Sequence, residues 1–220
     1  RAVSTAGLAS LVRAGTLSPE AAALLWEGAA AGCSLVVMAM PRLAGKTTLL
    51  EATVASGGHA RHEFYGSGRE VDALRASPER GHLVVAEVSP GFMPGYLWGE
   101  PVRRAFALAR DGFALAATLH APGVEECFEI LCGYNRVPDE DAATVSLAVH
   151  LHVQRGADPW SPRRVVDAIH EVEGVDAGRP RTRLLHRWDR SADRFELVDL
   201  PRGFGSRGSL EARTATLSGR

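Results

Sequence analysis

The chain is poor in cysteine, in net charge and in long hydrophobic runs. Its three cysteines, Cys33, Cys127 and Cys132, form no even set and no Cys-x-x-Cys pair, which argues against a disulfide framework or a metal site and predicts buried free thiols. Basic and acidic residues number 25 and 26, so no global field attracts nucleic acid or an anionic membrane. The longest apolar stretch, residues 34–40, is far below the roughly 20 residues that span a bilayer. Without a basic and apolar leader at its start, the chain is predicted to be cytoplasmic and to bind no nucleic acid.

Lysine is scarcer than any other charged residue. Lys46 is the only one, and the other 24 of the 25 basic residues are arginine. A GC-rich coding sequence alone produces such a bias. Where arginine replaces lysine everywhere else, however, a surviving lysine can mark a site that needs a compact ammonium group instead of a planar guanidinium.

The middle of the chain has the pattern of an α/β protein. A hydrophobic content of 45% is enough for a real core. Residues 34–40 are suited to a strand that is buried on both faces, and residues 47–55 look helical. Further buried strands are expected at 82–88 and 113–121, each after a helical segment. Strands that alternate with helices predict a mostly parallel sheet.

The C-terminal part of the chain follows a different pattern. Several segments between residues 145 and 200 alternate polar and apolar residues with turn residues between them, which predicts an antiparallel β-meander. Residues 202–220 are dominated by Gly, Ser, Arg and Thr, so we expect a disordered tail. Residues 1–16 are interpreted as the remnant of a missing upstream segment, and 17–201 as the main domain.

Lys46 lies in a loop of the kind that binds phosphate. In such loops, backbone amides and a helix N-terminus surround the phosphates, Lys adds a charge, and Ser or Thr supplies an oxygen to Mg²⁺. The full pattern is G-x-x-x-x-G-K-[ST], and this chain has Met40 at the first glycine and Pro41 after it. The residues predicted to bind ATP are Arg42, Leu43, Ala44, Gly45, Lys46, Thr47 and Thr48, with Thr47 as the Mg²⁺ ligand. A relic or coincidental loop stays open as the alternative.

Four segments in order resemble the secretion and pilus traffic ATPases of the type II/type IV secretion family, within the P-loop NTPase superfamily. They are RAGTLSPEAAALLWEGAAAGCSLVVMAM with GKTTLLEA, HLVVAEV, DGFALAATLHA, and HVQR with RRVVDAIHEVEG. The chain looks most like the branch that serves tight-adherence pili and type IV secretion. The resemblance implies a RecA-like fold, ATP and Mg²⁺ as ligands, a hexameric homo-oligomer, and an inner-membrane secretion or pilus platform protein as partner. It also implies a peripheral position at the inner membrane through that partner.

The resemblance also assigns roles to three side chains outside the loop. Glu87 falls on the family's catalytic Walker B glutamate, and a structural ion pair is the alternative. His120 falls in the histidine box as a sensor of the γ-phosphate, and a core histidine is the alternative. Glu63 is the only candidate for the acidic box, and a solvated loop charge is the alternative. The chain departs from the family at Ala86, which replaces Gly, and at Ser89, which replaces Arg.

Two functions follow from these observations. The first is an ATP-binding and hydrolysing motor module of a secretion or pilus-assembly system. The second is a degenerate, catalytically impaired homologue that acts as a regulatory or structural subunit. Whether the altered loop around Met40 still binds ATP decides between the two functions. The pair Arg163 and Arg164 is interpreted as a solvated turn, with an interface or phosphate-binding role as the alternative.

Overall fold

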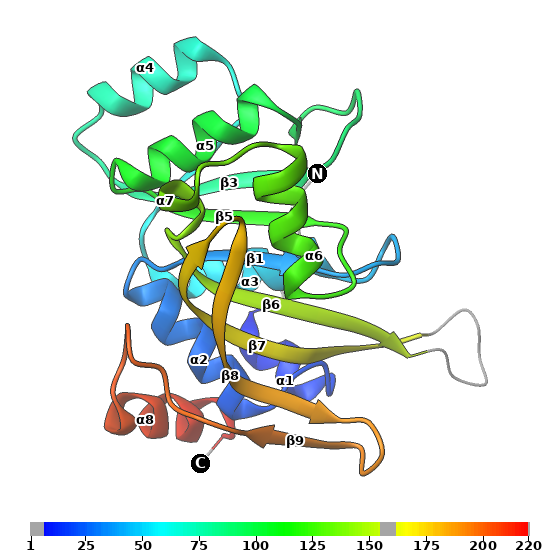
Figure 1. The fold of residues 1–220 in the computed structure, drawn as a ribbon. Coiled ribbons are helices and arrows are strands. Elements are labelled where there is room, and N and C mark those ends of the chain that lie inside the picture. Colours follow the sequence, from blue (N-terminus) through cyan, green and yellow to red (C-terminus); the bar gives the residue numbers. More distant parts are fainter. Residues whose placement is uncertain (1–6, 155–161, 220) are drawn as a thin grey trace.

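The computed structural model describes residues 7–154 and 162–219, which fold around one twisted sheet with helices on its faces (Figure 1). The helical elements are α1 (Leu8–Arg13), α2 (Pro19–Ala30), α3 (Lys46–Gly57), α4 (Gly68–Ala76), α5 (Glu100–Arg110), α6 (Val124–Phe128), the π-helix η1 (Glu129–Tyr134), α7 (Asp139–Ala142) and α8 (Arg207–Leu217). The strands are β1 (Ser34–Met38), β2 (Ala60–Glu63), β3 (Gly81–Val88), β4 (Tyr96–Leu97), β5 (Ala114–Leu119), β6 (Val145–Gln154), β7 (Arg163–Asp176), β8 (Arg179–Asp189) and β9 (Arg194–Leu197). Arg155 of the family-like segments and residues 1–6 of the expected remnant lie outside the described residues.

The sheet combines a parallel and an antiparallel half. Its strand order is β2-β3-β5-β1-β6-β7-β8-β9, with β4 paired to β3. Every pair from β2 to β6 is parallel, and every pair from β6 to β9 is antiparallel. The mixed α/β fold with a parallel sheet and a C-terminal meander is therefore confirmed. β6 belongs to both halves, because it pairs with β1 on one side and with β7 on the other.

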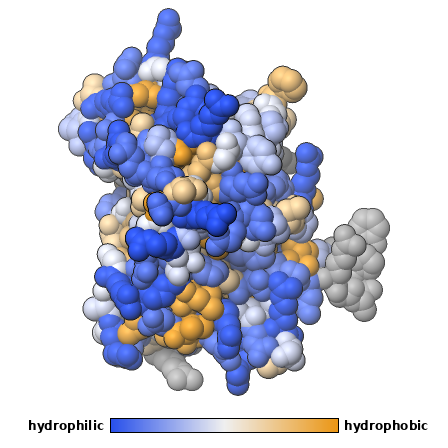
Figure 2. All heavy atoms as spheres, in the orientation of Figure 1, coloured by the Kyte–Doolittle hydropathy of each residue, from blue (hydrophilic) through white to orange (hydrophobic). Residues whose placement is uncertain are grey.

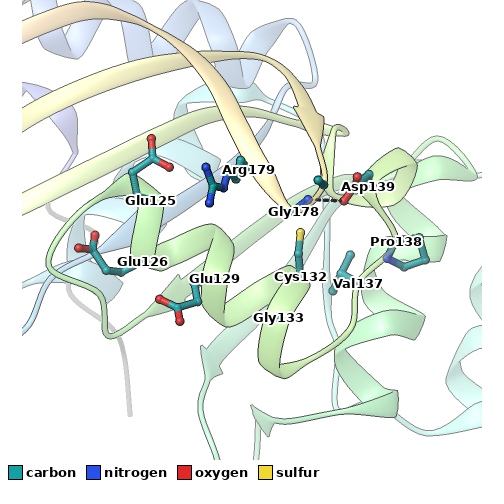
Figure 3. A pocket seen from close by; sticks show the side chains of 11 residues that line it. Glu125, Glu126, Glu129, Cys132, Gly133, Val137, Pro138, Asp139, Gly178 and Arg179 are labelled. Atoms are coloured by element: carbon teal, nitrogen blue, oxygen red, sulfur yellow. Dashed lines mark hydrogen bonds between the residues drawn. The ribbon is translucent and has the colours of Figure 1, made fainter.

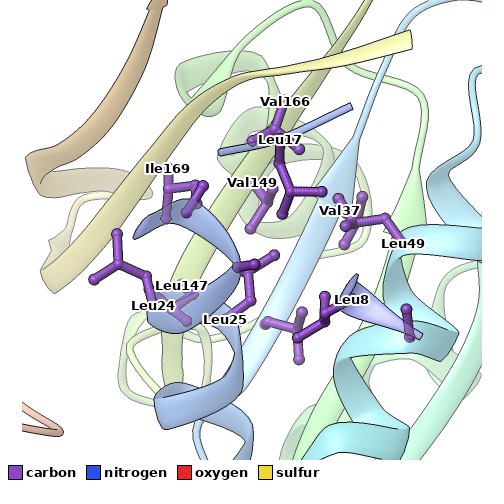
Figure 4. Close-up of a cluster of buried hydrophobic side chains, with 14 of the residues drawn as sticks. Leu8, Leu17, Leu24, Leu25, Val37, Leu49, Leu147, Val149, Val166 and Ile169 are labelled. Atoms are coloured by element: carbon purple, nitrogen blue, oxygen red, sulfur yellow. The ribbon is translucent and has the colours of Figure 1, made fainter. Parts of the chain in front are cut away.

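The two faces of the parallel half carry separate hydrophobic clusters. Figure 4 shows one of them, in which Leu24 and Leu25 of α2 and Leu49 of α3 lie against Val37 of β1. Val36 belongs to the other cluster, under α5 and α6. Since neighbouring residues of β1 point to opposite faces and both faces are covered, every residue of this strand is buried. This double burial is why the strand reads as an unbroken apolar run.

Helix α2 begins at Pro19, directly after its N-cap residue Ser18. The Ser18 hydroxyl accepts a hydrogen bond from the backbone amide of Ala21 at 3.1 Å, and Pro19 occupies the first helical position. The same hydroxyl lies 3.2 Å from Nε2 of His186 on β8. The helix start is thereby tied to the antiparallel half of the sheet.

The expectation of a disordered tail is wrong, because α8 is an ordered helix that packs against α2. Leu210 and Leu217 are seven residues apart, lie on one helix face and are buried in the cluster of Figure 4. Arg213 donates from Nε to Oε1 of Glu27 at 2.7 Å, and its guanidinium lies 4.0 Å from the centre of the Trp26 ring. The contacts of Leu210, Leu217 and Arg213 keep this segment folded, although its composition alone is typical of disorder.

The start of the described chain is also part of this core. Leu8 of α1 is buried, and α1 packs against α2 and α3. All three cysteines are free thiols as predicted, but only Cys127 is fully buried. Among the described residues, no helix is long and apolar enough to cross a membrane. The face of the molecule in Figure 2 is mostly polar, with hydrophobic atoms in small separate groups.

Candidate functional site

The loop between β1 and α3 leads directly into the first turn of α3. Gly45 precedes this helix with a φ of +92°, a conformation that favours glycine. A Cβ at Gly45 would lie 3.1 Å from Cδ of Arg164, so this position is also sterically restricted. The first amides of a helix have no acceptor within it, and together with the helix dipole they attract anions. The loop therefore has the backbone arrangement of a phosphate site.

The strand order brings three charged or polar side chains together at one edge of the sheet. β5 lies between β1 and β3, so His120, which follows β5, stands between the loop after β1 and Glu87 near the end of β3. Nζ of Lys46 lies 3.4 Å from Oε2 of Glu87 and 3.3 Å from Nε2 of His120. Ligands of open α/β sheets bind at this edge, outside the carboxyl ends of the strands.

Glu87 is buried, and its two carboxylate oxygens have different surroundings. Oε2 faces Lys46 and lies 3.0 Å from the Thr118 hydroxyl, which is also 2.6 Å from the carbonyl oxygen of Ala86. Oε1 has no hydrogen-bond partner among the described residues, and Nε2 of His120 is 4.0 Å away. A buried acceptor without a partner is costly, so such groups are found where a ligand or a reaction needs them.

His120 links the loop to Lys46. Its Nδ1 lies 3.0 Å from the carbonyl oxygen of Met40, and this hydrogen bond assigns the ring proton to Nδ1. The lone pair of Nε2 is then available to the ammonium group of Lys46. Burial lowers the pKa of Lys46 below its ordinary value, and the Glu87 carboxylate partly opposes that shift.

These groups line a cavity of about 570 Å³. The predicted residues that line it are Arg42, Leu43, Ala44, Gly45, Lys46, Thr47, Thr48, Glu87 and His120. Sequence reasoning missed Tyr96, which also lines the cavity. Tyr96 begins the two-residue strand β4, whose surrounding sequence carries no recognisable motif, and its pairing with Glu87 in the sheet brings it to the site.

Glu63 does not lie in this cavity, contrary to expectation. It ends the edge strand β2, where its carboxylate accepts a hydrogen bond from Nε of Arg61 at 3.0 Å. Arg61 also pairs with Glu51 on α3, and the Glu63 side chain is 44% exposed. The solvated ion pair is therefore the better interpretation, because the nearby arginine satisfies the carboxylate at the surface.

The site residues fit a magnesium ion that arrives with a nucleotide. Thr47 is exposed on the first turn of α3, and Glu87 has one free carboxylate oxygen. Mg²⁺ typically binds through one or two protein oxygens together with phosphate oxygens and water. In the part of the chain that the structure describes, no three His, Cys, Asp or Glu side chains gather as a metal cage. The site therefore suits a phosphate-bound ion better than a structural one.

A second cavity of about 650 Å³ lies beside η1 (Figure 3). It is lined by Glu125, Glu126, Glu129 and Asp139, with Arg179 as the only basic residue. Burial, with a smaller contribution from Asp139, raises the pKa of the Cys132 thiol in its wall to about 11. Carboxylates repel phosphate, so this cavity is the poorer candidate for a nucleotide despite its larger volume.

Comparison with known proteins finds similarity of fold but no matching sequence. No family model and no curated protein matches the sequence. Among solved structures, the VirB11 ATPase of the Brucella suis type IV secretion system, in complex with sulphate, aligns over 74% of this chain with a TM-score of 0.52 and 15% identity. The Legionella pneumophila ATPase DotB aligns over 66% of this chain with a TM-score of 0.44 and 17% identity.

The chain spans about half the length of these proteins, 54% of VirB11 and 47% of DotB. The likeness to VirB11 agrees with the resemblance found in the sequence, whereas the tight-adherence branch remains a prediction. At this identity the comparison concerns architecture. The aligned part of this chain has a RecA-like α/β fold similar to that of the VirB11 ATPase.

Proposed function

We propose that the chain binds ATP with Mg²⁺ at the loop cavity and hydrolyses it, as the motor module of a secretion or pilus-assembly system. The observation that carries the proposal is the cluster of the buried Lys46 and Glu87 with the half-buried His120 beside the first turn of α3. A lysine, a carboxylate and a histidine at the carboxyl ends of adjacent parallel strands have the chemistry that phosphoryl transfer needs.

Binding starts from a Lys46 ammonium that is already desolvated. The β- and γ-phosphates bind to the amides of residues 45–48, and Lys46 moves part of its interaction from Glu87 to the phosphates. The Thr47 hydroxyl would hold Mg²⁺, which would neutralise charge on the phosphates. As Lys46 turns to the nucleotide, the Glu87 carboxylate becomes available for another partner.

Hydrolysis then depends on Glu87. A water molecule held at Oε1 attacks the γ-phosphorus, the bond to the β,γ-bridging oxygen breaks, and ADP leaves. The proton of the attacking water passes to the carboxylate and from there to the released phosphate. His120 lies beside both Lys46 and Glu87 and contacts the γ-phosphate, so that the loss of this group is transmitted to the loop through Met40.

The assembly part of the proposal comes from the resemblance. The chain forms a hexameric ring, is cytoplasmic, and docks on an inner-membrane secretion or pilus platform protein. The likeness of fold to a secretion ATPase supports this assignment. No nucleic acid takes part, in keeping with the balanced charge of the chain.

One observation favours the second candidate, a nucleotide-binding subunit without turnover. The first loop position carries the exposed side chain of Met40, and Leu43 has a φ of +60° that is uncommon for a non-glycine residue. A loop strained in this way holds phosphates less tightly than one built on glycine. Binding without hydrolysis would then be the function of the same site.

Titration of the purified chain with ATP, with and without Mg²⁺, tests the proposal. Both Lys46→Ala and Lys46→Arg should lose about tenfold or more in affinity, because a planar guanidinium does not replace a compact ammonium in this buried position. Turnover is measured at high protein concentration so that a ring can form. Equal ATP binding by the wild type and Lys46→Ala would rule out the phosphate site, and firm binding without turnover would favour the regulatory subunit.

A further inference from the structure

A small cavity lies on the other side of the loop, away from Glu87 and His120. Its volume is about 210 Å³, and it lies between α1, the loop and the antiparallel strands. It shares Ala44, Gly45 and Thr48 with the larger cavity and adds Leu11, Leu151 and Arg164. The two cavities therefore meet across the first turn of α3.

The sizes of the two cavities suit two parts of one ligand. Sites for whole small molecules usually measure roughly 300–1,000 Å³, so the smaller cavity is too small for a complete nucleotide. The larger one holds the loop amides, Lys46 and Glu87, which suit phosphates. A ligand whose phosphates lie on residues 45–48 extends its other end past Thr48, toward the smaller cavity.

We propose that the small cavity holds the base and ribose of the nucleotide, with the Arg164 guanidinium against the flat face of the base. This inference rests on the proposed function, because it assumes phosphates on the loop. Leu11 and Leu151 supply apolar walls from α1 and β6, as a heterocyclic ring requires. Planar guanidinium groups stack on aromatic rings, also at exposed positions such as that of Arg164.

The position of Arg164 is set before any ligand binds. Its Nε donates to the carbonyl oxygen of Leu43 at 3.0 Å, and its Cδ lies close to Gly45. The segment after α1 is fixed as well, because the carbonyl oxygen of Thr16 accepts a hydrogen bond from the amide of Val166 at 2.7 Å. A wall that is already ordered costs little conformational entropy on binding.

Arg164 could instead serve only to hold the loop in shape. That role and the proposed one differ in their dependence on the base. A residue that only shapes the loop affects every ligand with the same phosphates, whereas a residue of the base site affects only ligands that carry a base. Inorganic tripolyphosphate provides the chain of phosphates without the nucleoside.

The test compares the affinities of ATP and inorganic tripolyphosphate, both with Mg²⁺, by calorimetry on the whole chain. The wild type should bind ATP about tenfold more tightly or better. Leu11→Trp, which fills the small cavity, should lower the ATP affinity to that of tripolyphosphate and leave tripolyphosphate binding unchanged. Arg164→Met, which keeps the length of the side chain without its planar group, should lose most of the same preference. Arg163→Met is the matched control, because Arg163 pairs with Asp193 instead.

Each outcome decides between the interpretations. Retained tripolyphosphate binding shows that a variant is folded around its loop, and if Leu11→Trp fails to fold, Arg164→Met carries the test. Equal affinities of the wild type for the two ligands, or an unchanged preference for ATP in the variant that folds, would overturn the base site and leave the phosphate site standing. If Arg164→Met lowers the affinities for ATP and tripolyphosphate equally, Arg164 only positions the loop. If neither ligand binds the wild type, both proposals fail.

Discussion

The ammonium nitrogen of Lys46 lies 3.4 Å from Oε2 of Glu87, and both side chains are buried. In the absence of nucleotide, each therefore compensates the charge of the other in a place where a single charge would be costly. The contact also occupies Oε2 of Glu87, so among the described residues only Oε1 is left open to another ligand. Under the proposed function, a nucleotide that attracts Lys46 would change the environment of Glu87 in the same step, which would couple binding to the readiness for hydrolysis.

Replacing Glu87 should separate binding from turnover. Glu87→Gln keeps the size of the side chain but removes the carboxylate that orients water, so ATP should stay bound while turnover falls about 100-fold or more. Steady-state phosphate release and ATP titration measure the two quantities. Glu63→Gln is the matched control, because the same exchange is made outside the cavity, and its turnover should equal that of the wild type. A Glu87→Gln protein with full turnover would contradict the catalytic role.

Repair of the first loop position should strengthen binding. In Met40→Gly with Pro41→Ala, glycine removes the side chain from the first turn and alanine restores one backbone donor. The carbonyl group of residue 40, which accepts from His120, is retained. We expect several-fold tighter ATP binding, on the order of 1 kcal/mol. If calorimetry shows no gain over a wild type that already binds in the micromolar range, the altered turn is fully competent.

Acid should destabilise the fold through His82. This residue on β3 is fully buried, and burial, together with the nearby His59, lowers its pKa from 6.5 to about 4. The unfolded chain therefore binds the proton first, and stability is lost as the pH falls from 6.5 toward 4. One pKa unit corresponds to about 1.4 kcal/mol, so His82 should account for about 3 kcal/mol between pH 7 and 4.

His82→Leu removes this titration while keeping an apolar side chain in the core. Urea unfolding at pH 7 and pH 4 should show a smaller loss of stability in the variant than in the wild type. The same loss in both proteins would mean that other groups, such as the buried His186, cause the acid sensitivity.

The packing of α8 predicts a measurable loss of stability. Leu210→Ala removes a buried side chain and should lower the free energy of unfolding by about 2–4 kcal/mol. Glu211→Ala, at the exposed neighbouring position, should change it by less than about 0.5 kcal/mol. If the two variants unfold at the same denaturant concentration as the wild type, α8 contributes nothing to the core.

The parallel half of the sheet could be predicted because its strands are buried on both faces. The continuous apolar runs at β1, β3 and β5 and the Gly-Lys-Thr loop between β1 and α3 are local features of the sequence. They also place Lys46, Glu87 and His120 at one edge, since parallel strands share their direction. This part of the site follows from strand order and needs no knowledge of side-chain contacts.

The remaining features depend on contacts between distant parts of the chain. β2 reads as a loop because it is a short edge strand with exposed charged residues, and the sequence offers no candidate for the acidic box other than Glu63. Tyr96 reaches the cavity only through the pairing of β4 with β3. Arg164 meets the loop from a strand more than a hundred residues later, and α8 is stabilised by its contacts with α2. Such long-range partners leave no mark in local composition or periodicity.

The double pairing of β6 has a mechanical consequence. One side of this strand is hydrogen-bonded to β1, which leads into the loop before Lys46, and the other side is hydrogen-bonded to the meander that carries Arg164. The meander thus closes an edge of the parallel half that would otherwise expose open backbone groups to other chains. A rigid-body rotation of the meander away from the parallel half would have to break the ladder along β6. A displacement of β1 at its loop end would therefore be passed to β6, and from there to β7, through the hydrogen bonds that join these strands.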